Sequence, residues 1–179
     1  MICLTILFGL CYLSLAKEYK AVDELDLPSY MGKWFQVYQD NFNKLFQRNG
    51  KCSTATYEIV DENKVSVLNK QINEKKNQLD QIVGYAYYKH DDCCGYLTVK
   101  LKDTPEAPYW VLELGPIVNG FYDYSIVSDD KALALFVLTR DVDRFYKYYD
   151  DEVLKSLESF GFTKKYNTPV VMNQTDCFN

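Results

Sequence analysis

The chain has 179 residues and a formal net charge of −5 at pH 7. A net negative charge with no basic stripe to offset it argues against a nucleic-acid partner. Aromatic residues make up 16% of the chain and most of them are tyrosines, which suits a half-buried β-sheet where the ring packs and the hydroxyl reaches water or a partner.

Residues 1–16 predict a signal peptide. They carry no charged side chain, they include an apolar run over residues 4–10, and Ser14-Leu15-Ala16 places small residues where a signal peptidase cleaves. The apolar run is too short for a comfortable membrane span. We therefore expect cleavage before Lys17, secretion to the extracellular space, at most peripheral membrane contact, and a single domain over residues 17–179.

Eight β-strands are predicted after the leader. Short segments of this kind, separated by turns rich in Gly, Pro, Asn and Asp, are typical of a β-sandwich or β-barrel. The expected strands cover residues 34–40, 52–60, 65–72, 79–89, 96–102, 108–114, 121–128 and 132–140.

A helical pattern follows the last of these strands. Apolar residues recur at three- and four-residue steps over residues 142–160, with Asp141 suited to the N-cap and Gly161 to the C-terminal end. Asp150-Asp151 offers a second start, which would divide the segment into a short turn and a main helix. Residues 169–171 predict a final short strand. Eight strands before one helix do not form a βαβ alternation, so an all-β fold is expected.

Four cysteines remain after removal of the leader: Cys52, Cys93, Cys94 and Cys177. An even number in an exported chain indicates disulfides, and four cysteines allow three connectivities. A bond between Cys52 and Cys177 would tie the tail to the second strand. If that bond forms, Cys93 and Cys94 form a vicinal disulfide or stay free. If it does not form, they can pair with Cys52 and Cys177 instead. Asn173-Gln174-Thr175 is a sequon that makes Asn173 a glycosylation candidate.

Two short motifs about a hundred residues apart carry a resemblance to a known family. Gly32-Lys33-Trp34 opens the first strand, and Thr139-Arg140-Asp141 ends the last. The Arg140 guanidinium can lie over the Trp34 indole at the floor of a barrel, a cation–π contact worth roughly 0.5–2 kcal/mol, and Gly32 lets the chain turn closely into the strand. Together with residues 31–35, 52–57, 107–112, 124–127 and 138–140, these motifs resemble the lipocalin family, in the branch of apolipoprotein D, the insect bilin-binding lipocalins and the bacterial lipocalins.

The resemblance implies an eight-stranded antiparallel up-and-down β-barrel, the lipocalin calyx, with one C-terminal α-helix packed outside. The barrel is closed at one end by the N-terminal segment and holds one small ligand. Gly32, Trp34, Thr139 and Arg140 are its structural motif. The resemblance places loops 41–51, 73–78, 102–108 and 128–132 around the mouth, and His90, Cys93 and Cys94 at the closed end. Residues 113–116 and a longer turn replace the family's usual middle motif, which leaves partner contacts at the closed end open.

The alternation of each strand sends one set of side chains into the barrel. The expected cavity residues are Gln36, Tyr38, Val67, Asn69, Leu97, Val99, Trp110, Leu112, Tyr124, Ile126, Leu135 and Val137. They offer an apolar ligand cavity with a few polar groups, or they fill a packed barrel; a register shift of one residue turns any of them outward. In the first mouth loop, Phe42, Leu45 and Phe46 are expected to cap a ligand, touch a membrane or pack on the barrel.

Signals for catalysis and for metal binding are poor. His90 is not accompanied by a serine in a nucleophile elbow, and a His90–Cys94 pair would lie in a solvent-facing turn. A metal site built from His90, Asp91, Asp92 and Cys93 would need ligands from adjacent turn positions to converge. We therefore expect no enzyme activity, no metal and no required cofactor.

The expected function is transport of one small hydrophobic ligand: a lipid, a fatty acid, a sterol or a bilin-type pigment, which is a tetrapyrrole. Two other classes of function stay open. One is an enzyme on the lipocalin scaffold that uses a cavity cysteine. The other is a ligand-free protein-interaction module whose barrel is filled by side chains. The residues do not indicate whether the protein forms a homo-oligomer or binds a receptor.

Overall fold

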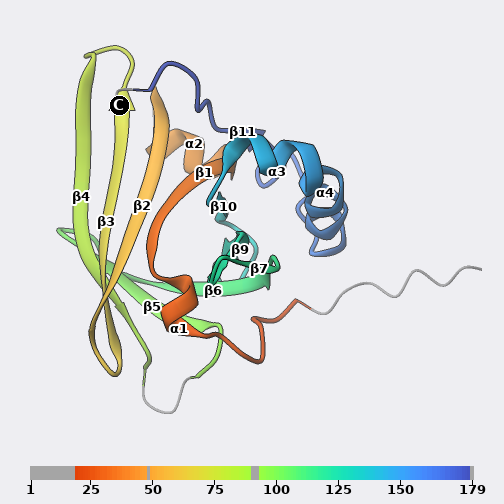
Figure 1. Cartoon of the computed structure of the whole chain (residues 1–179). Coiled ribbons are helices and arrows are strands. Elements are labelled where there is room, and N and C mark those ends of the chain that lie inside the picture. Colours follow the sequence, from red (N-terminus) through yellow and green to blue (C-terminus); the bar gives the residue numbers. More distant parts are fainter. Residues whose placement is uncertain (1–18, 48, 90–92, 178–179) are drawn as a thin grey trace, which may run out of the picture.

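One antiparallel sheet curls until its first and last barrel strands meet (Figure 1). The computed structural model describes residues 19–47, 49–89 and 93–177, with only the backbone for 44–46. The sheet order is β10-β9-β6-β5-β4-β3-β2-β1-β11, and the additional pairing of β1 with β10 closes the barrel. The predicted signal peptide, residues 1–16, and the turn residues His90, Asp91 and Asp92 lie outside the described residues.

The barrel strands follow each other around the wall mostly in chain order. They are β1 (Gly32–Asp40), β2 (Gly50–Asp61), β3 (Lys64–Asn73), β4 (Gln78–Tyr87), β5 (Tyr96–Leu101), β6 (Glu106–Leu114), β9 (Tyr124–Ser128) and β10 (Leu135–Thr139). Beyond the barrel, β11 (Pro169–Val171) pairs with β1, and β7 (Ile117–Val118) with β8 (Phe121–Tyr122) makes a separate hairpin. The helices are α1 (Leu27–Tyr30), α2 (Asn41–Phe46), α3 (Val142–Tyr148) and α4 (Asp150–Ser159).

The predicted fold is confirmed, and so is the second helix start offered by Asp150-Asp151, because the helical segment is divided into α3 and α4 at Tyr149. Asp141 caps α3 by accepting a hydrogen bond from the Arg144 N–H (2.9 Å). Two local differences remain. The strand predicted over 121–128 is divided into β8 and β9 at Asp123. The first mouth loop begins with α2, because the Asp40 side chain accepts from the Asn43 N–H (2.6 Å) and starts a helical turn.

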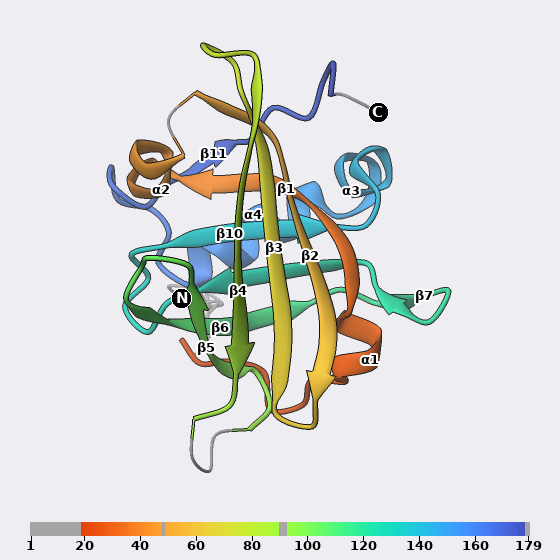
Figure 2. The same ribbon diagram turned by 90° about the vertical axis from the view of Figure 1, so that its left-hand side faces the viewer.

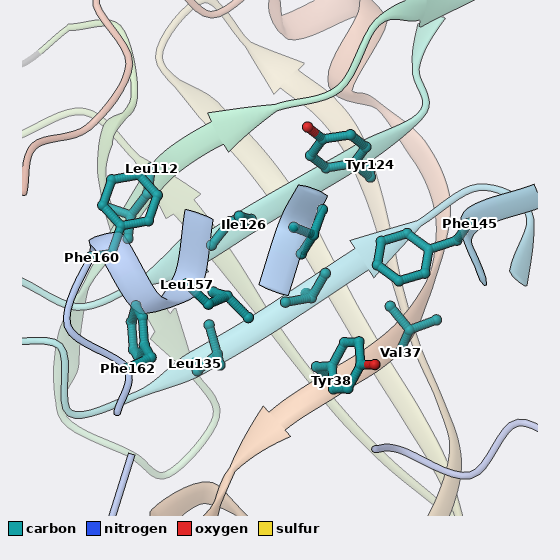
Figure 3. Packing of buried hydrophobic residues seen from close by; sticks show 12 residues of the cluster. Val37, Tyr38, Leu112, Tyr124, Ile126, Leu135, Phe145, Leu157, Phe160 and Phe162 are labelled. Atoms are coloured by element: carbon teal, nitrogen blue, oxygen red, sulfur yellow. The ribbon is translucent and has the colours of Figure 1, made fainter. Parts of the chain in front are cut away.

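Apolar side chains form two cores, one on each side of the barrel wall. The inner core, inside the barrel, contains Tyr30, Trp34, Ala55, Tyr57, Val65, Val67, Ala86, Leu97, Val111, Val127 and Leu138. The outer core lies between the wall and the C-terminal helices (Figure 3) and contains Val37, Tyr38, Leu112, Tyr124, Ile126, Leu135, Val137, Phe145, Val153, Leu157, Phe160 and Phe162. Strands β1, β6, β9 and β10 therefore bury side chains on both faces. Strands β2, β3 and β4 lie on the opposite side of the barrel from α4, which is behind them in Figure 2.

A bulge in β1 redirects the side chains beyond it. Gln36 pairs with Leu138 and Tyr38 with Val137, so the register shifts between Gln36 and Tyr38. A bulge sets two residues opposite one and thereby changes which face the following side chains occupy. Tyr38 turns to the outer core, where its hydroxyl donates to Asp150 (2.8 Å).

The C-terminal tail is held along the barrel by a disulfide between Cys52 and Cys177, as predicted. Gln174 adds two hydrogen bonds, from Nε2 to the carbonyl oxygens of Gln36 (2.7 Å) and Ser53 (2.9 Å). Cys93 is paired with Cys94, which is one of the alternatives left open by the sequence. Among the described residues, no helix is both long and apolar enough to cross a membrane.

Candidate functional site

The barrel encloses a cavity on the side of α2. Its outer part has a volume of about 350 Å³ and its inner part about 110 Å³. Both parts are lined by Gln47, Ser53, Asn69, Leu101 and Phe136, so they adjoin each other. Beyond the inner part, toward α1, only about 10 Å³ remains between Tyr30, Leu97 and their neighbours. The cavity is thus sealed at the α1 end, and a ligand would enter from the α2 end.

The two parts of the cavity differ in charge. Lys70 and Asp80 line the outer part. The described residues that line the inner part are uncharged: Val67, Val99 and Leu138 supply apolar wall, and Tyr57 and Tyr109 supply hydroxyls. Such a mixture of apolar wall with a few polar groups is typical of small-molecule sites.

Three amide side chains around the cavity make hydrogen bonds within the protein: those of Gln36, Asn43 and Gln47. Gln36 and Gln47 form a reciprocal pair in which each Nε2 donates to the other's Oε1 (3.3 Å both ways). Asn43 Nδ2 donates to Asp40 (3.1 Å) and to the Leu135 carbonyl (3.2 Å). Asn69 differs, because its buried Oδ1 accepts no hydrogen bond from the described residues.

A chain of hydroxyl groups lies between the inner cavity and the closed end. The Tyr109 hydroxyl is 3.0 Å from that of Tyr57 and 2.8 Å from that of Tyr30, which is 3.1 Å from Ser125 Oγ. Removal of water from these groups raises the pKa of Tyr30 to about 12 and also raises the pKa values of Tyr57 and Tyr109. The hydroxyls are therefore neutral and can both donate and accept.

The raised pKa values predict alkaline instability. A pKa that is higher in the folded than in the unfolded chain leaves stability intact below the unfolded value, about 10, and removes it as pH rises toward the folded value. We expect a loss of about 0.8 kcal/mol for each of Tyr30, Tyr57 and Tyr109 at about pH 10.5, or roughly 2–3 kcal/mol together. Urea unfolding at about pH 8 and 10.5 measures this loss. Tyr57→Phe should show a smaller one, and equal free energies at both pH values would contradict the prediction.

At the closed end, Arg140 covers Trp34. The guanidinium carbon lies 3.6 Å from the centre of the Trp34 ring, and the indole Nε1 donates to the Tyr30 carbonyl (2.9 Å). Gly32 has φ +91°, and a Cβ there would meet Arg140 Nη1 at 3.4 Å. Thr139 Oγ1 donates to the Asp123 carbonyl (3.1 Å). The motif predicted from the sequence therefore joins the first strand, the last strand and the α1 segment into a floor.

The structure divides the twelve predicted cavity residues between the two sides of the wall. Gln36, Val67, Asn69 and Val99 line the cavity, and Leu97 lines its closed end. The other seven belong to the outer core or pack against it, so their placement in the cavity was wrong: Tyr38, Trp110, Leu112, Tyr124, Ile126, Leu135 and Val137. Figure 3 shows Tyr38, Leu112, Tyr124, Ile126 and Leu135 in that core. Apart from Tyr38, which follows the bulge, all lie on strands that bury both faces, where apolar character does not distinguish inside from outside.

Several cavity residues were missed for the same reason. Tyr109, Phe136 and Leu138 line the inner part, and each is a neighbour in sequence of a residue that was expected there. A usable signal was present in the motif itself. Because Arg140 must point inward to cover Trp34, strand alternation places Leu138 and Phe136 inside as well.

The remaining candidates lie away from the cavity or outside the described residues. Phe42 on α2 is 45% exposed at the mouth, while the side chains of Leu45 and Phe46 are not described. Cys94 lies near the closed end, where its carbonyl accepts from the Tyr88 hydroxyl (3.1 Å). Within the described ranges, no group of three or more His, Cys, Asp and Glu residues could hold a metal ion.

Comparison with known proteins gives both sequence and structural matches. Residues 25–167 match the family model for the lipocalin-like domain. The outer membrane lipoprotein Blc of Vibrio cholerae is 30% identical over 128 residues, covering 72% of each chain. Apolipoprotein D of Cavia porcellus is 31% identical over 91 residues, covering 50% of this chain and 46% of that one. The structure of insecticyanin from Manduca sexta has a TM-score of 0.64 at 16% identity, covering 90% of this chain and 87% of that one, and shows the same fold.

These matches agree with the geometry of the barrel. The family match runs from before α1 to beyond α4, so it includes the floor, the wall and the outer helices. The resemblance to Blc and to apolipoprotein D is confirmed by sequence. The chain belongs to the lipocalin family.

Proposed function

We propose that this protein is a secreted, non-enzymatic carrier that holds one small hydrophobic molecule in its barrel cavity. Lipocalins bind small hydrophobic ligands. The observation that carries the proposal for this chain is the two-part cavity inside the barrel, sealed at the α1 end and lined along its inner part by uncharged described residues. Burial of apolar ligand surface supplies the affinity, about 25 cal/mol per Å², and the amides and hydroxyls orient the ligand. A lipid, a fatty acid, a sterol and a bilin-type pigment are the candidate ligands.

Export is part of the same proposal. Residues 1–16 have the pattern of a signal peptide, and a disulfide such as Cys52–Cys177 persists in oxidising compartments. Asn173 is exposed, and its Oδ1 accepts from Thr175 Oγ1 (2.7 Å) within the sequon. These features support secretion with glycosylation at Asn173, provided that the route is eukaryotic.

The rival enzyme needs a free, activated thiol in the cavity. Cys52 is bonded to Cys177 and Cys93 to Cys94, which favours the carrier over thiol chemistry. The alternative function as a ligand-free protein-interaction module requires a barrel filled by side chains. The cavity inside the barrel argues against this function.

A pair of adjacent substitutions in β3 tests the carrier proposal. Val67→Trp fills the inner cavity and is expected to weaken binding of a fluorescent fatty acid at least tenfold, because the indole occupies the ligand's space. Leu68→Trp changes the neighbouring residue on the opposite face of the strand and should leave binding unchanged. Titration of both variants, with circular dichroism to confirm folding, gives the comparison. If the wild type bound no lipid, bilin or fluorescent fatty acid, the interaction module would replace the carrier.

A further inference from the structure

We propose that the closed end of the barrel carries a second binding site on its outer side, for a small organic anion with an aromatic body. The site is a groove of about 270 Å³, called here the closed-end groove. It lies between the start of β1, the β7–β8 hairpin and α3, and its lining includes Gly32, Lys33, Val118, Phe121, Arg140 and Arg144. The groove shares no lining residue with either part of the barrel cavity, so the site is independent of the proposed carrier function.

A short hairpin supplies the apolar wall of the closed-end groove. Val118 of β7 pairs with Phe121 of β8, and the turn between them has φ +52° at Asn119 and +85° at Gly120. Positive φ at both central residues is typical of a tight two-residue turn that matches the twist of the paired strands. Figure 2 shows this hairpin projecting from the barrel, and Phe121 is 45% exposed on it. An aromatic ligand can therefore gain affinity by covering Phe121 and removing it from water.

Positive charge exceeds negative charge along the groove. Its charged lining residues are Lys33, Arg140, Arg144 and Asp123. Arg144 and Asp123 compensate each other, because Arg144 Nε donates to one carboxylate oxygen at 2.7 Å and Nη2 donates to the other. Lys33 is exposed and forms no ion pair with a described residue, and Arg140 donates only to carbonyl oxygens among them. Two cations therefore lack a carboxylate partner, and they attract an anion to this part of a chain whose net charge is −5.

Arg140 offers a hydrogen-bond donor at the surface of the groove. Its Nη1 carries two N–H groups, and among the described residues it donates only to the Lys33 carbonyl (2.8 Å), in a bond that is exposed. Gly32 leaves this nitrogen uncovered, since a Cβ there would lie 3.4 Å from it. Burial lowers the pKa of Arg140 to about 10, because no carboxylate bound to the guanidinium offsets its loss of water. An anion at Nη1 would supply that missing partner.

The two features lie close enough for one small molecule to use both. The Phe121 ring centre is 5.3 Å from the Arg140 guanidinium carbon. An aryl carboxylate can place its carboxylate at Arg140 and Lys33 and its ring on Phe121. An inorganic anion would leave Phe121 exposed, and a neutral aromatic molecule would leave both cations without a partner, so each should bind more weakly.

Nuclear magnetic resonance titration of the isotope-labelled protein with 2-naphthoate and its neutral analogue 2-naphthamide tests the site. The backbone amide signals of Gly32, Asn119 and Phe121 report on the groove, and those of Val67 and Val99 report on the barrel cavity. 2-Naphthoate is expected to shift the groove signals and to bind there about tenfold more tightly than 2-naphthamide. Shifts confined to the barrel signals, equal affinities of the two probes for the groove, or unshifted groove signals at about 5 mM 2-naphthoate would each overturn the proposal.

Two matched pairs of surface variants assign the binding to the groove. Lys33→Gln is expected to weaken 2-naphthoate binding about threefold, whereas Lys155→Gln makes the same charge change at an exposed position of α4, outside the groove lining, and should leave it unchanged. Phe121→Ala should weaken binding about tenfold. Ile117→Ala removes an exposed side chain from the other face of the same hairpin and should leave binding unchanged. Circular dichroism confirms folding of all four variants, and equal effects within either pair would overturn the assignment.

Discussion

The Arg140→Ala variant is expected to lose about 3–5 kcal/mol of unfolding free energy. Its guanidinium stacks on Trp34 and donates to the carbonyl oxygens of Ser29, Tyr30, Met31, Lys33 and Tyr122. Hydrogen bonds from charged donors contribute more than hydrogen bonds from neutral donors. Without Arg140, these carbonyl oxygens lose a charged donor, and the Tyr30 carbonyl keeps only its bond from the Trp34 indole. The free energies are not additive, so the expected loss is well below the sum over these bonds.

Urea unfolding at neutral pH measures the loss. Arg140→Lys keeps the charge but not the planar fork of donors, so an intermediate loss is expected. Lys147→Ala removes an exposed basic residue of α3 and should change the unfolding free energy by at most about 0.5 kcal/mol. A loss below about 1 kcal/mol for Arg140→Ala would show that the floor does not depend on Arg140.

The contact between Arg140 and Trp34 also explains why the fold could be predicted from the sequence. A Trp at the start of one strand and an Arg at the end of another, far apart in sequence, are needed together only if the strands meet, and they do meet as β1 and β10. Helix boundaries were also readable, because Asp141 caps α3 through its own side chain. Such features depend on side-chain chemistry that a single sequence displays.

The cavity was only partly predictable. On β3 and β5 the outer face carries Ser66 and Lys100, so alternation identified Val67 and Val99 correctly. On β6 the outward face packs against the outer core with Leu112, whereas Val111 faces inward. Two apolar faces give no alternation to follow.

Two further features depend on pairing between strands. The bulge after Gln36 exists only as a register shift between β1 and β10, and it moved Tyr38 out of the cavity. The lack of a hydrogen-bond partner for the buried Asn69 Oδ1 among the described residues likewise depends on how the neighbouring strands pack around it. Sequence patterns describe the faces of one strand at a time, so neither feature could be derived from them.

Breaking the Cys52–Cys177 disulfide is expected to lower the unfolding free energy by about 5 kcal/mol, because the bond closes a loop with a sequence separation of 125 residues. In the chain-entropy account, a cross-link stabilises mainly by restricting the unfolded chain, and the effect grows with loop length. The Cys52→Ser/Cys177→Ser double variant should unfold at lower urea concentration under non-reducing conditions. Below its own melting temperature, the double variant should still bind ligand. The Met172 N–H still donates to the Val37 carbonyl (2.9 Å) and keeps the tail beside β1.

The other cysteine pair supplies the matched control. Cys93 and Cys94 are adjacent, so their bond closes no long loop, and Cys93→Ser/Cys94→Ser should change the unfolding free energy by at most about 1 kcal/mol. Cys177→Ser alone breaks the long-range bond without altering buried Cys52. If Cys177→Ser and the Cys52→Ser/Cys177→Ser variant lose the same free energy, the stabilisation comes from the cross-link. If only variants that change Cys52 are unstable, it comes from packing of Cys52 in the wall, and the chain-entropy explanation is wrong.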